Sequence, residues 1–359
     1  MPTELAITCE SEKYYDDFIK VAERITIARA QALPDIKPYY SMKEVYRFIS
    51  SLTPKDILYV RYPPIPKITV PILLNNRAQT IFELNGIPSK ETGERAPINP
   101  FWRAMEELIG PLILSRGDGI VGVTDEISRH YLARIRRDDI KNISISNGIA
   151  CADIPLRNYS PILERQIHLI GVGFVSNWHG FDRIIKGISD YKGDRKYIFH
   201  IIGDGPEIAV LKRLVNNLEL ENNVIFHGFQ AGETLNKLYS VCDVAVSTLA
   251  IHRKGLTNHC SLKSREYCAR GIPFIYAGND PDFINDFEFA LQAPMGDEPI
   301  QMEIVGKFYD RLMTRSSYPI QMRNYAESNL DWDVKWLGML SFIDNILKDT
   351  PIITTEIVR

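Results

Sequence analysis

Lys263 and Glu266 are the residues of this chain whose types and spacing point most directly to chemistry. They follow Ser261, a suitable helix N-cap, and precede Gly271, a suitable helix stop. The first turn of a helix offers unpaired N–H groups and partial positive charge, and Lys263 adds a formal charge, which predicts a phosphate site. Glu266 lies one turn later on the same face and can accept hydrogen bonds from two hydroxyls, as a ribose presents them. The alternative is an exposed stripe with a weak ion pair, formed by Lys263, Glu266, Tyr267 and Arg270.

Three turn sequences follow apolar runs that we predict to be strands. They are Trp178-His179-Gly180, Gly203-Asp204-Gly205-Pro206 and His227-Gly228-Phe229. His179 titrates near neutrality when unperturbed and can supply a donor or a positive charge to a phosphate. Gly171-Val172-Gly173 begins a dinucleotide-type turn, but Ser176 replaces its third glycine, so this motif is weak evidence. The turns therefore favour a ligand site over a dinucleotide-specific one.

The elements that must position these residues alternate between strand and helix. Between residues 198 and 275, short apolar runs alternate with longer segments of helical period, which predicts a parallel sheet with crossover helices. Such sheets bind ligands beyond the carboxyl ends of their strands, where all three turns lie. We expect the runs 197–202, 224–226, 244–247 and 273–276 to be strands, and the sheet pattern to give way to helices after Asp280.

The first half of the chain predicts a second α/β unit. Helical period covers 14–33, 42–52, 102–114 and 125–137, and strands are expected at 56–61, 80–85, 119–124 and 142–146. No glycine precedes Gly86, so the Gly-rich turn that usually opens a nucleotide-binding domain is absent here and backbone binding of a phosphate falls to the second half. We therefore expect domains at 1–155 and 167–325, a linker at 156–166 and a helical tail at 326–359 that packs back on the first domain.

Bulk composition sets the class of protein. The 359 residues carry a net charge of −3, with 45% hydrophobic and 24% charged residues, which is typical of a globular protein and disfavours a nucleic-acid partner. Five scattered cysteines without a C-x-x-C pair favour reduced thiols in a cytosol. The acidic N-terminus and the lack of a long apolar run predict neither a signal peptide nor a membrane span. The histidine and carboxylate spacings predict no protein-bound metal.

Together these motifs resemble those of retaining, group-1 type glycosyltransferases of the GT-B fold, of a bacterial surface-polysaccharide kind. The resemblance covers about residues 56 to 345 and is carried by Gly203–Pro206, Val224–Phe229, the Leu238–Asp243 helix end and Lys263–Pro273, with a looser match at Glu83–Gly86, Gly122–Thr124 and Ser146–Ile149. It implies two Rossmann-like domains, with a nucleotide-sugar bound by the C-terminal one and the acceptor by the N-terminal one. Transfer to a saccharide or lipid-linked acceptor in polysaccharide biosynthesis follows, with retention and without metal.

The resemblance also assigns roles to residues. The diphosphate leaving group would be stabilised by Lys263, Arg183 or His179 and by helix amides. Glu266 matches the family's ribose-binding glutamate. Asn258 stands where the family has a first glutamate and can still hydrogen-bond sugar hydroxyls. Further donor-side residues are Trp178, Gly203, Asp204, His227, Gly228, Phe229, Ser261 and Leu262, and Glu83 and Asn85 are the acceptor-side candidates. Phe174 and His179 replace the family's usual arginine and lysine.

Two other functions remain open. A degenerate glycosyltransferase-like subunit could bind a nucleotide or a partner without turnover, in keeping with Asn258 and Phe174. A nucleotide-sugar epimerase shares the two-domain architecture. The expected location is cytoplasmic, with peripheral contact at the inner face of the membrane if Arg134, Arg136 and Arg137 touch anionic lipid; a solvated face is the alternative.

Overall fold

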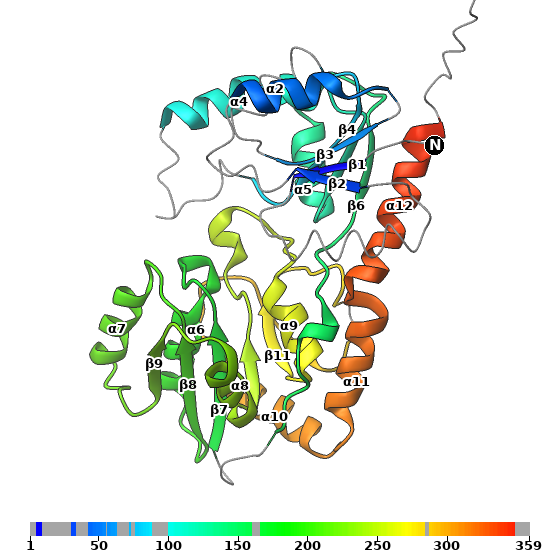
Figure 1. Cartoon of the computed structure of the whole chain (residues 1–359). Coiled ribbons are helices and arrows are strands. Elements are labelled where there is room, and N and C mark those ends of the chain that lie inside the picture. Colours follow the sequence, from blue (N-terminus) through cyan, green and yellow to red (C-terminus); the bar gives the residue numbers. More distant parts are fainter. Residues whose placement is uncertain are drawn as a thin grey trace, which may run out of the picture. The chain divides into compact units, whose positions relative to one another are not determined.

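The computed structural model describes residues 5–8, 30–33, 42–54, 56–62, 72, 76–87, 100–159, 166–283 and 287–348. The chain forms two compact units (Figure 1). Unit 1 comprises Met1–Ser89, Ile98–Ile145 and Trp336–Arg359, and unit 2 comprises Lys90–Pro97 and Ser146–Lys335. Each unit contains one six-stranded sheet whose described strands all pair in parallel. The predicted α/β class with two parallel sheets is therefore confirmed.

The sheet of unit 1 has the strand order β2-β1-β3-β4-β5-β6. Its strands are β1 (Leu5–Thr8), β2 (Ala30–Leu33), β3 (Ile57–Tyr62), β4 (Gln79–Leu84), β5 (Gly119–Gly122) and β6 (Lys141–Ser144). Its helices are α2 (Met42–Ser51), α4 (Pro100–Leu114) and α5 (Asp125–Leu132). Thr124 caps α5 by accepting a hydrogen bond from the Ile127 amide, and Asp125 and Glu126 place negative charge in its first turn.

The last described helix, α12 (Trp332–Lys348), completes the core of unit 1. Side chains that alternate along β3, together with Ile81 and Val121, form one apolar face of the sheet. That face packs against Met339, Phe342, Ile343 and Ile346 of the helix. The expected return of the C-terminal helix to the N-terminal domain is confirmed, whereas the residue boundaries 155, 166 and 325 stay predictions.

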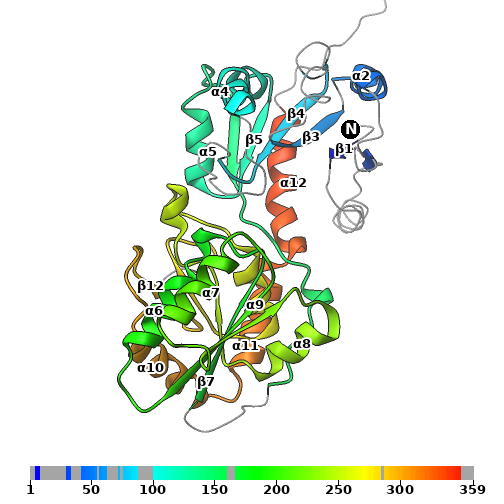
Figure 2. The ribbon, with the colours of Figure 1, turned by 90° about the vertical axis from the view of Figure 1, so that its left-hand side faces the viewer.

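The sheet of unit 2 has the order β12-β11-β10-β7-β8-β9. Its strands are β7 (Gln166–Val172), β8 (Lys196–Ile202), β9 (Val224–Gly228), β10 (Val244–Val246), β11 (Phe274–Ala277) and β12 (Ala290–Ala293). The helices α6 (Phe181–Asp190) and α7 (Ile208–Asn217) cover one face, and α8 (Gly232–Val241) and α9 (Leu262–Arg270) cover the other (Figure 2). α10 (Met302–Met313) and α11 (Tyr318–Tyr325) follow the last strand, and α11 packs against α9.

Strand order explains where a ligand site is expected in unit 2. The chain proceeds from β7 through β8 to β9 on one side and from β10 through β11 to β12 on the other. The direction of winding therefore reverses between β7 and β10. Loops after two such strands diverge and leave a crevice at the carboxyl edge of the sheet.

Three secondary-structure predictions are corrected. The helix expected over 14–33 is contradicted at its end, because Ala30–Leu33 pairs in parallel with β1; residues 14–29 lie outside the described residues. The helix expected over 125–137 ends at Leu132. The sheet does not fade after Asp280, because Ala290–Ala293 pairs with β11. In both strand cases, pairing with a neighbour decides a four-residue segment whose own periodicity is too short to be informative.

Candidate functional site

Backbone hydrogen bonds tie together the turns that follow β7, β8 and β9. The Gly173 amide donates to the Ile202 carbonyl (3.0 Å), and the Gly203 amide donates to the Gly228 carbonyl (2.7 Å). The Val175 amide donates to the Asp204 carbonyl (2.7 Å). These bonds hold three of the predicted donor-side turns as one layer at the carboxyl edge of the sheet.

Glycine is required where these turns touch. Gly203 has a φ of +115°, and a Cβ there would lie 2.0 Å from the Gly173 carbonyl oxygen. Gly205 has a φ of +150°, and its Cβ would lie 2.3 Å from the Val175 carbonyl oxygen. The Gly-Asp-Gly sequence is therefore a packing requirement of the layer. Asp204, between the two glycines, is exposed at its surface.

The loop after β7 also joins the loop after β10, across the reversal in strand order. The amides of Leu249 and Ala250 donate to the carbonyls of His179 (3.0 Å) and Trp178 (3.1 Å). The short helix Ile251–Lys254 follows, and Lys254 Nζ lies 4.5 Å from the centre of the Trp178 ring. Trp178 is half-buried, so its ring lies at the surface of the loop rather than in the core.

Lys263 lies beside this layer, in the first turn of α9. A Cβ on Gly173 would lie 3.7 Å from Lys263 Cδ, and Nζ lies 5.6 Å from the centre of the Phe181 ring. The Nζ atom is buried and has no hydrogen-bond partner in the described part of the chain. Burial lowers the pKa of Lys263 to about 7. A buried amine without a partner is costly, and an anion would supply what it lacks.

The start of α9 has capacity for an anion as well. Ser261 is the N-cap residue, but its side chain makes no capping hydrogen bond. The amides of the first turn are therefore not satisfied by that side chain, and they lie on the same turn as Lys263. Leu262, 44% exposed, shields this turn only in part.

His179 is buried and held by a local hydrogen bond. The Ser176 amide donates to His179 Nδ1 (3.0 Å), so the proton of the neutral ring resides on Nε2. Burial, and then the charges of Lys263 and Lys254, hold the pKa of His179 well below its ordinary value. From the sequence, His179 could act on a phosphate either as a hydrogen-bond donor or as a positive charge. The lowered pKa favours a neutral ring that donates a hydrogen bond.

Arg183 has a structural environment. Its guanidinium is buried and donates to the carbonyl oxygens of Glu298 (2.8 Å), Pro294 (2.9 Å) and Leu249. These bonds tie α6 to the segment after β12 and to the loop after β10. The predicted contact with a diphosphate stays a prediction for this residue, although its donors already bind backbone carbonyls.

Glu266 lies one turn after Lys263, as the sequence predicts, and its side chain is 29% exposed. Its Oε1 accepts a hydrogen bond from Arg270 Nε (2.8 Å). The ion pair that the sequence left open as an alternative is thus present. It does not exclude a ligand, because a carboxylate has lone pairs on both oxygens.

The remaining donor-side predictions lie at the same edge. His227 is the penultimate residue of β9 and is hydrogen-bonded to His200, while Phe229 directly follows the strand and is 74% exposed. Asn258 pairs with Asn279 as an isolated bridge and accepts a hydrogen bond from its side-chain amide (3.0 Å). An exposed aromatic ring at a turn suits stacking on a flat ligand.

The acceptor-side candidates Glu83 and Asn85 belong to unit 1. Glu83 is the penultimate residue of β4 and accepts hydrogen bonds from Tyr59 Oη (2.6 Å) and from the Asn85 side chain. Burial, followed by the Glu83 charge, raises the pKa of Tyr59 well above its ordinary value, so the phenol remains a donor to this carboxylate. The structure thus brings the two predicted residues together.

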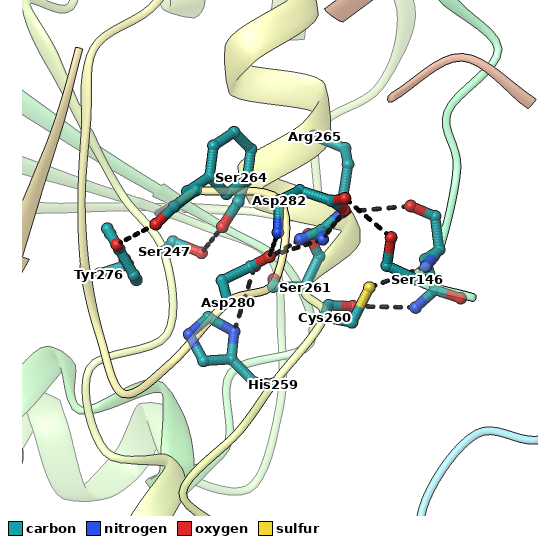
Figure 3. Close-up of polar contacts among 12 residues, drawn as sticks. Ser146, Ser247, His259, Cys260, Ser261, Ser264, Arg265, Tyr276, Asp280 and Asp282 are labelled. Carbon is teal, nitrogen blue, oxygen red and sulfur yellow. Dashed lines mark hydrogen bonds and ion pairs between the residues drawn. The ribbon is translucent and has the colours of Figure 1, made fainter. Parts of the chain in front are cut away.

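A buried ion cluster at the start of α9 was not predicted from the sequence. Arg265 is fully buried and pairs with Asp280 and Asp282 (Figure 3). It also donates to the carbonyls of Ser261 and Asn147, both at 3.2 Å. Burial opposes the charge, but the two carboxylates raise the pKa of Arg265 above its ordinary value. The cluster fixes the first turn of α9, and therefore Lys263, in place.

The arginines expected on one helix are placed differently. α5 ends at Leu132, so Arg134, Arg136 and Arg137 lie in the turns that follow it. Arg134 donates to the Glu107 carbonyl (3.1 Å), and Arg137 pairs with Asp139 (2.6 Å). Across the described residues, no helix is long and apolar enough to cross a membrane. Nor do the described histidine, cysteine and acidic side chains form a group of three or more suited to a metal ion.

Comparisons with known proteins agree with this site. Residues 155–282 match the family model of glycosyl transferases group 1. The curated alpha-monoglucosyldiacylglycerol synthase of Streptococcus pneumoniae (strain ATCC BAA-255 / R6) is 28% identical over 149 residues, which are 41% of this chain and 31% of that protein. The chain thus matches about a third of that relative's length.

Several solved structures share the whole fold. A glycosyltransferase from Rickettsia africae ESF-5 has a TM-score of 0.63 at 15% identity, over 97% of this chain and 98% of that one. The Anabaena protein HepE, in complex with UDP and glucose, has a TM-score of 0.63 at 13% identity, over 95% and 99%. The sucrose-phosphate synthase of Thermosynechococcus elongatus has a TM-score of 0.61 at 13% identity, over 96% and 98%.

These matches support a group 1 glycosyltransferase. The two parallel sheets have the GT-B architecture of these neighbours. The segment that matches the family model runs from before β7 to the end of the Arg265 cluster, so it contains the layer of turns, Lys263 and Glu266. Sequence similarity and site geometry therefore converge on unit 2.

Proposed function

We propose that this protein is a retaining glycosyltransferase that moves a sugar from a nucleoside-diphosphate sugar to a saccharide or lipid-linked acceptor. The observation that carries the proposal is the buried Nζ of Lys263, which lacks a described partner beside the uncapped first turn of α9. A diphosphate would satisfy both the amine and the helix amides. The family match over residues 155–282 and the UDP bound by HepE make this ligand class the best supported.

The donor would be held by a short set of contacts. Lys263 and the amides of α9 contact the diphosphate, with His179 Nε2–H as a neutral donor. Glu266 accepts from the ribose hydroxyls, and the base lies against the His227–Phe229 turn. Asn258 contacts sugar hydroxyls, and Trp178 borders the diphosphate. Glu83 and Asn85 are proposed to contact the acceptor.

The reaction follows from these contacts. The bond between the sugar's anomeric carbon and the diphosphate oxygen breaks, and negative charge develops on the leaving group. Lys263 and the α9 amides stabilise that charge, which lowers the barrier more than it lowers the energy of the bound substrate. The acceptor oxygen then bonds to the anomeric carbon from the face that the diphosphate leaves, and its proton passes to the departing diphosphate oxygen. Because the protein supplies the positive charge, we expect transfer without added divalent metal.

The first test is binding by calorimetry of UDP, GDP, ADP and CMP in the presence of a chelator, to the wild type and to Glu266→Ala. We expect one nucleotide to bind the wild type with micromolar affinity. Its affinity for the variant should be at least tenfold lower, since hydrogen bonds to a charged group contribute about 1.5–3 kcal/mol. Binding of none of the four would refute the donor site.

Turnover is tested separately. The sugar conjugate of the nucleotide that binds is incubated with the protein, and NMR monitors its cleavage and the configuration of the anomeric centre. Retention supports the full proposal. Tight binding without cleavage or transfer would favour a binding subunit without turnover, the function for which Asn258 and Phe174 leave room. Acceptor, cytoplasmic location and peripheral membrane contact are proposals that await an identified donor.

A further inference from the structure

Arg270 is the last residue of α9, and its side chain is held at three points. Its Nε donates to Glu266 Oε1 (2.8 Å), and its Nη1 donates to the Asn236 side-chain carbonyl on α8 (2.9 Å). Its guanidinium carbon lies 4.2 Å from the centre of the Tyr239 ring. The side chain is only 8% exposed, whereas that of Glu266 is 29% exposed. Arg270 is therefore enclosed, and the carboxylate that it contacts is open to solvent.

The supports of Arg270 are themselves fixed. Tyr239 is fully buried on α8, and its ring packs edge-on against Tyr267 of α9 at 6.2 Å. Burial, and then the charge of Glu266, raise the pKa of Tyr239 well above its ordinary value, so its ring stays neutral beneath the guanidinium. Gly271 follows Arg270 with a φ of +70° and no room for a Cβ, because Pro319 is in contact. The arginine thus has little freedom to turn away from Glu266.

A surface salt bridge between helix neighbours usually contributes little, because two mobile side chains must be ordered to form it. Here the arginine is already ordered by Asn236 and Tyr239, so the pair costs less to form. One oxygen of Glu266 is directed by the arginine, and the carboxylate as a whole gains a defined orientation. This is the arrangement by which a supporting residue orients a group that touches a ligand.

Resting on the proposed function, we propose that Arg270 is a positioning residue that orients Glu266 toward the two hydroxyls of the donor ribose. It does not touch the ligand itself. The preference of the protein for ribonucleotides over 2′-deoxyribonucleotides then depends on Arg270. A site built to hydrogen-bond a hydroxyl discriminates against the analogue that lacks it, but only while its acceptor is held in the right place.

The test measures the affinities of UDP and 2′-deoxy-UDP by calorimetry, or those of the GDP or ADP pair if one of these is the nucleotide that binds. The variants are Arg270→Met, which retains the stem over Tyr239, and Arg270→Lys, which retains charge but cannot contact Glu266 and Asn236 together. The matched control is Arg195→Met, which removes an arginine paired with Asp310 at the amino end of β8. Glu266→Ala and the double variant Glu266→Ala, Arg270→Met complete a double-mutant cycle.

We expect the wild type to prefer UDP by about tenfold or more. In both Arg270 variants, the ratio of UDP affinity to 2′-deoxy-UDP affinity should fall most of the way to one. The fall should come from weaker UDP binding, with the 2′-deoxy-UDP affinity nearly unchanged. Arg195→Met should retain it. In the Glu266→Ala background, Arg270→Met should have little further effect, because the two residues act as one unit.

Three results would overturn the proposal. The ratio could remain at its wild-type value in both Arg270 variants while Glu266→Ala abolishes it. The Arg270 variants could weaken both nucleotides equally along with thermal stability, which is the behaviour of a purely structural arginine. Additive losses in the double variant would also contradict it. If the wild type binds none of the nucleotides, the proposed function itself fails first.

Discussion

Gly203 and Gly173 approach each other so closely that a Cβ on Gly203 would lie 2.0 Å from the Gly173 carbonyl oxygen. Gly203→Ala should therefore separate the turns after β7 and β8. We expect the free energy of unfolding to fall by about 2 kcal/mol or more, because the change adds overlap to an unfavourable φ. Urea unfolding measures this loss. Gly228→Ala is the control: its φ is +64°, but no atom lies within 4 Å of the added Cβ. That variant should lose only about 1–2 kcal/mol, and an equal loss in both would contradict the packing argument.

Lys263 should take up a proton when a diphosphate binds. With a pKa of about 7, the free amine is about 90% neutral at pH 8. A bound anion favours the charged form, so the pKa rises and about 0.9 proton should be taken up per ligand at that pH. Calorimetry at pH 8 in buffers of different ionisation enthalpy measures this number. Lys263→Met should abolish the uptake, and Lys186→Met, in a half-buried pair with Asp182, should leave it intact. Unchanged uptake in Lys263→Met would assign the proton to another group.

A row of three histidines should make the protein sensitive to acid. His200 is hydrogen-bonded to His168 and to His227, both at 2.9 Å. Burial, then the two neighbouring imidazoles, lower the pKa of His200 to about 4. The pKa values of His168 and His227 are lowered too, chiefly by burial; the charge of Asp243 opposes the shift of His168, and that of Lys196 adds to it.

The sign of the effect follows from proton binding. Between pH 6.5 and 4 the unfolded chain binds more protons at these sites than the folded one, so stability is full above pH 6.5 and falls as pH decreases through this window. His200 alone should account for a loss on the order of 2 kcal/mol between pH 7.5 and pH 5. Urea unfolding at the two pH values tests this. His200→Leu should flatten the dependence relative to wild type, and His252→Gln, on the loop after β10, should not.

Arg183→Met should act on stability rather than selectively on ligand binding. The variant leaves the carbonyls of Glu298, Pro294 and Leu249 without their buried donor. A buried acceptor left unsatisfied typically costs about 1–3 kcal/mol, so we expect a loss of at least that size. Arg195→Met, which breaks a more exposed pair, should cost under about 1 kcal/mol. Should Arg183→Met unfold like wild type and yet lose nucleotide affinity, the predicted contact of Arg183 with the diphosphate would be supported instead.

Much of unit 2 could be predicted because short stretches of its sequence indicate where its strands and helices begin and end. The strands β7 to β11 are apolar runs, four of which have Gly, Pro or Asn at one or both ends. The helix with Lys263 and Glu266 has its own N-cap residue and glycine stop. Their common edge then follows from parallel pairing. β12 and β2 could not be predicted in this way. Each has four residues, too few to show a hydrophobic period, and its conformation depends on pairing with the neighbouring strand.

The partners of three arginines could not be predicted from the sequence, for one physical reason. Arg183 looks like an available cation in sequence, but two of its carbonyl partners lie 111 and 115 residues further along the chain. Arg270 looks like an exposed stripe residue, yet Asn236 on another helix holds it. Arg265 finds its partners 15 and 17 residues away, past β11. Whether an arginine is free or engaged depends on contacts that local spacing does not contain.

The position of α12 has a consequence for biosynthesis. The apolar face formed by Ile57, Tyr59, Ile81 and Val121 is covered by residues 339–346. A ribosome synthesises the chain from the N-terminal side. This face therefore stays uncovered until unit 2 has been synthesised and α12 has emerged. Unit 2 can meanwhile fold around its own core. The core of unit 1 is thus completed only after unit 2 has been synthesised, and the apolar face of its sheet stays uncovered until α12 emerges.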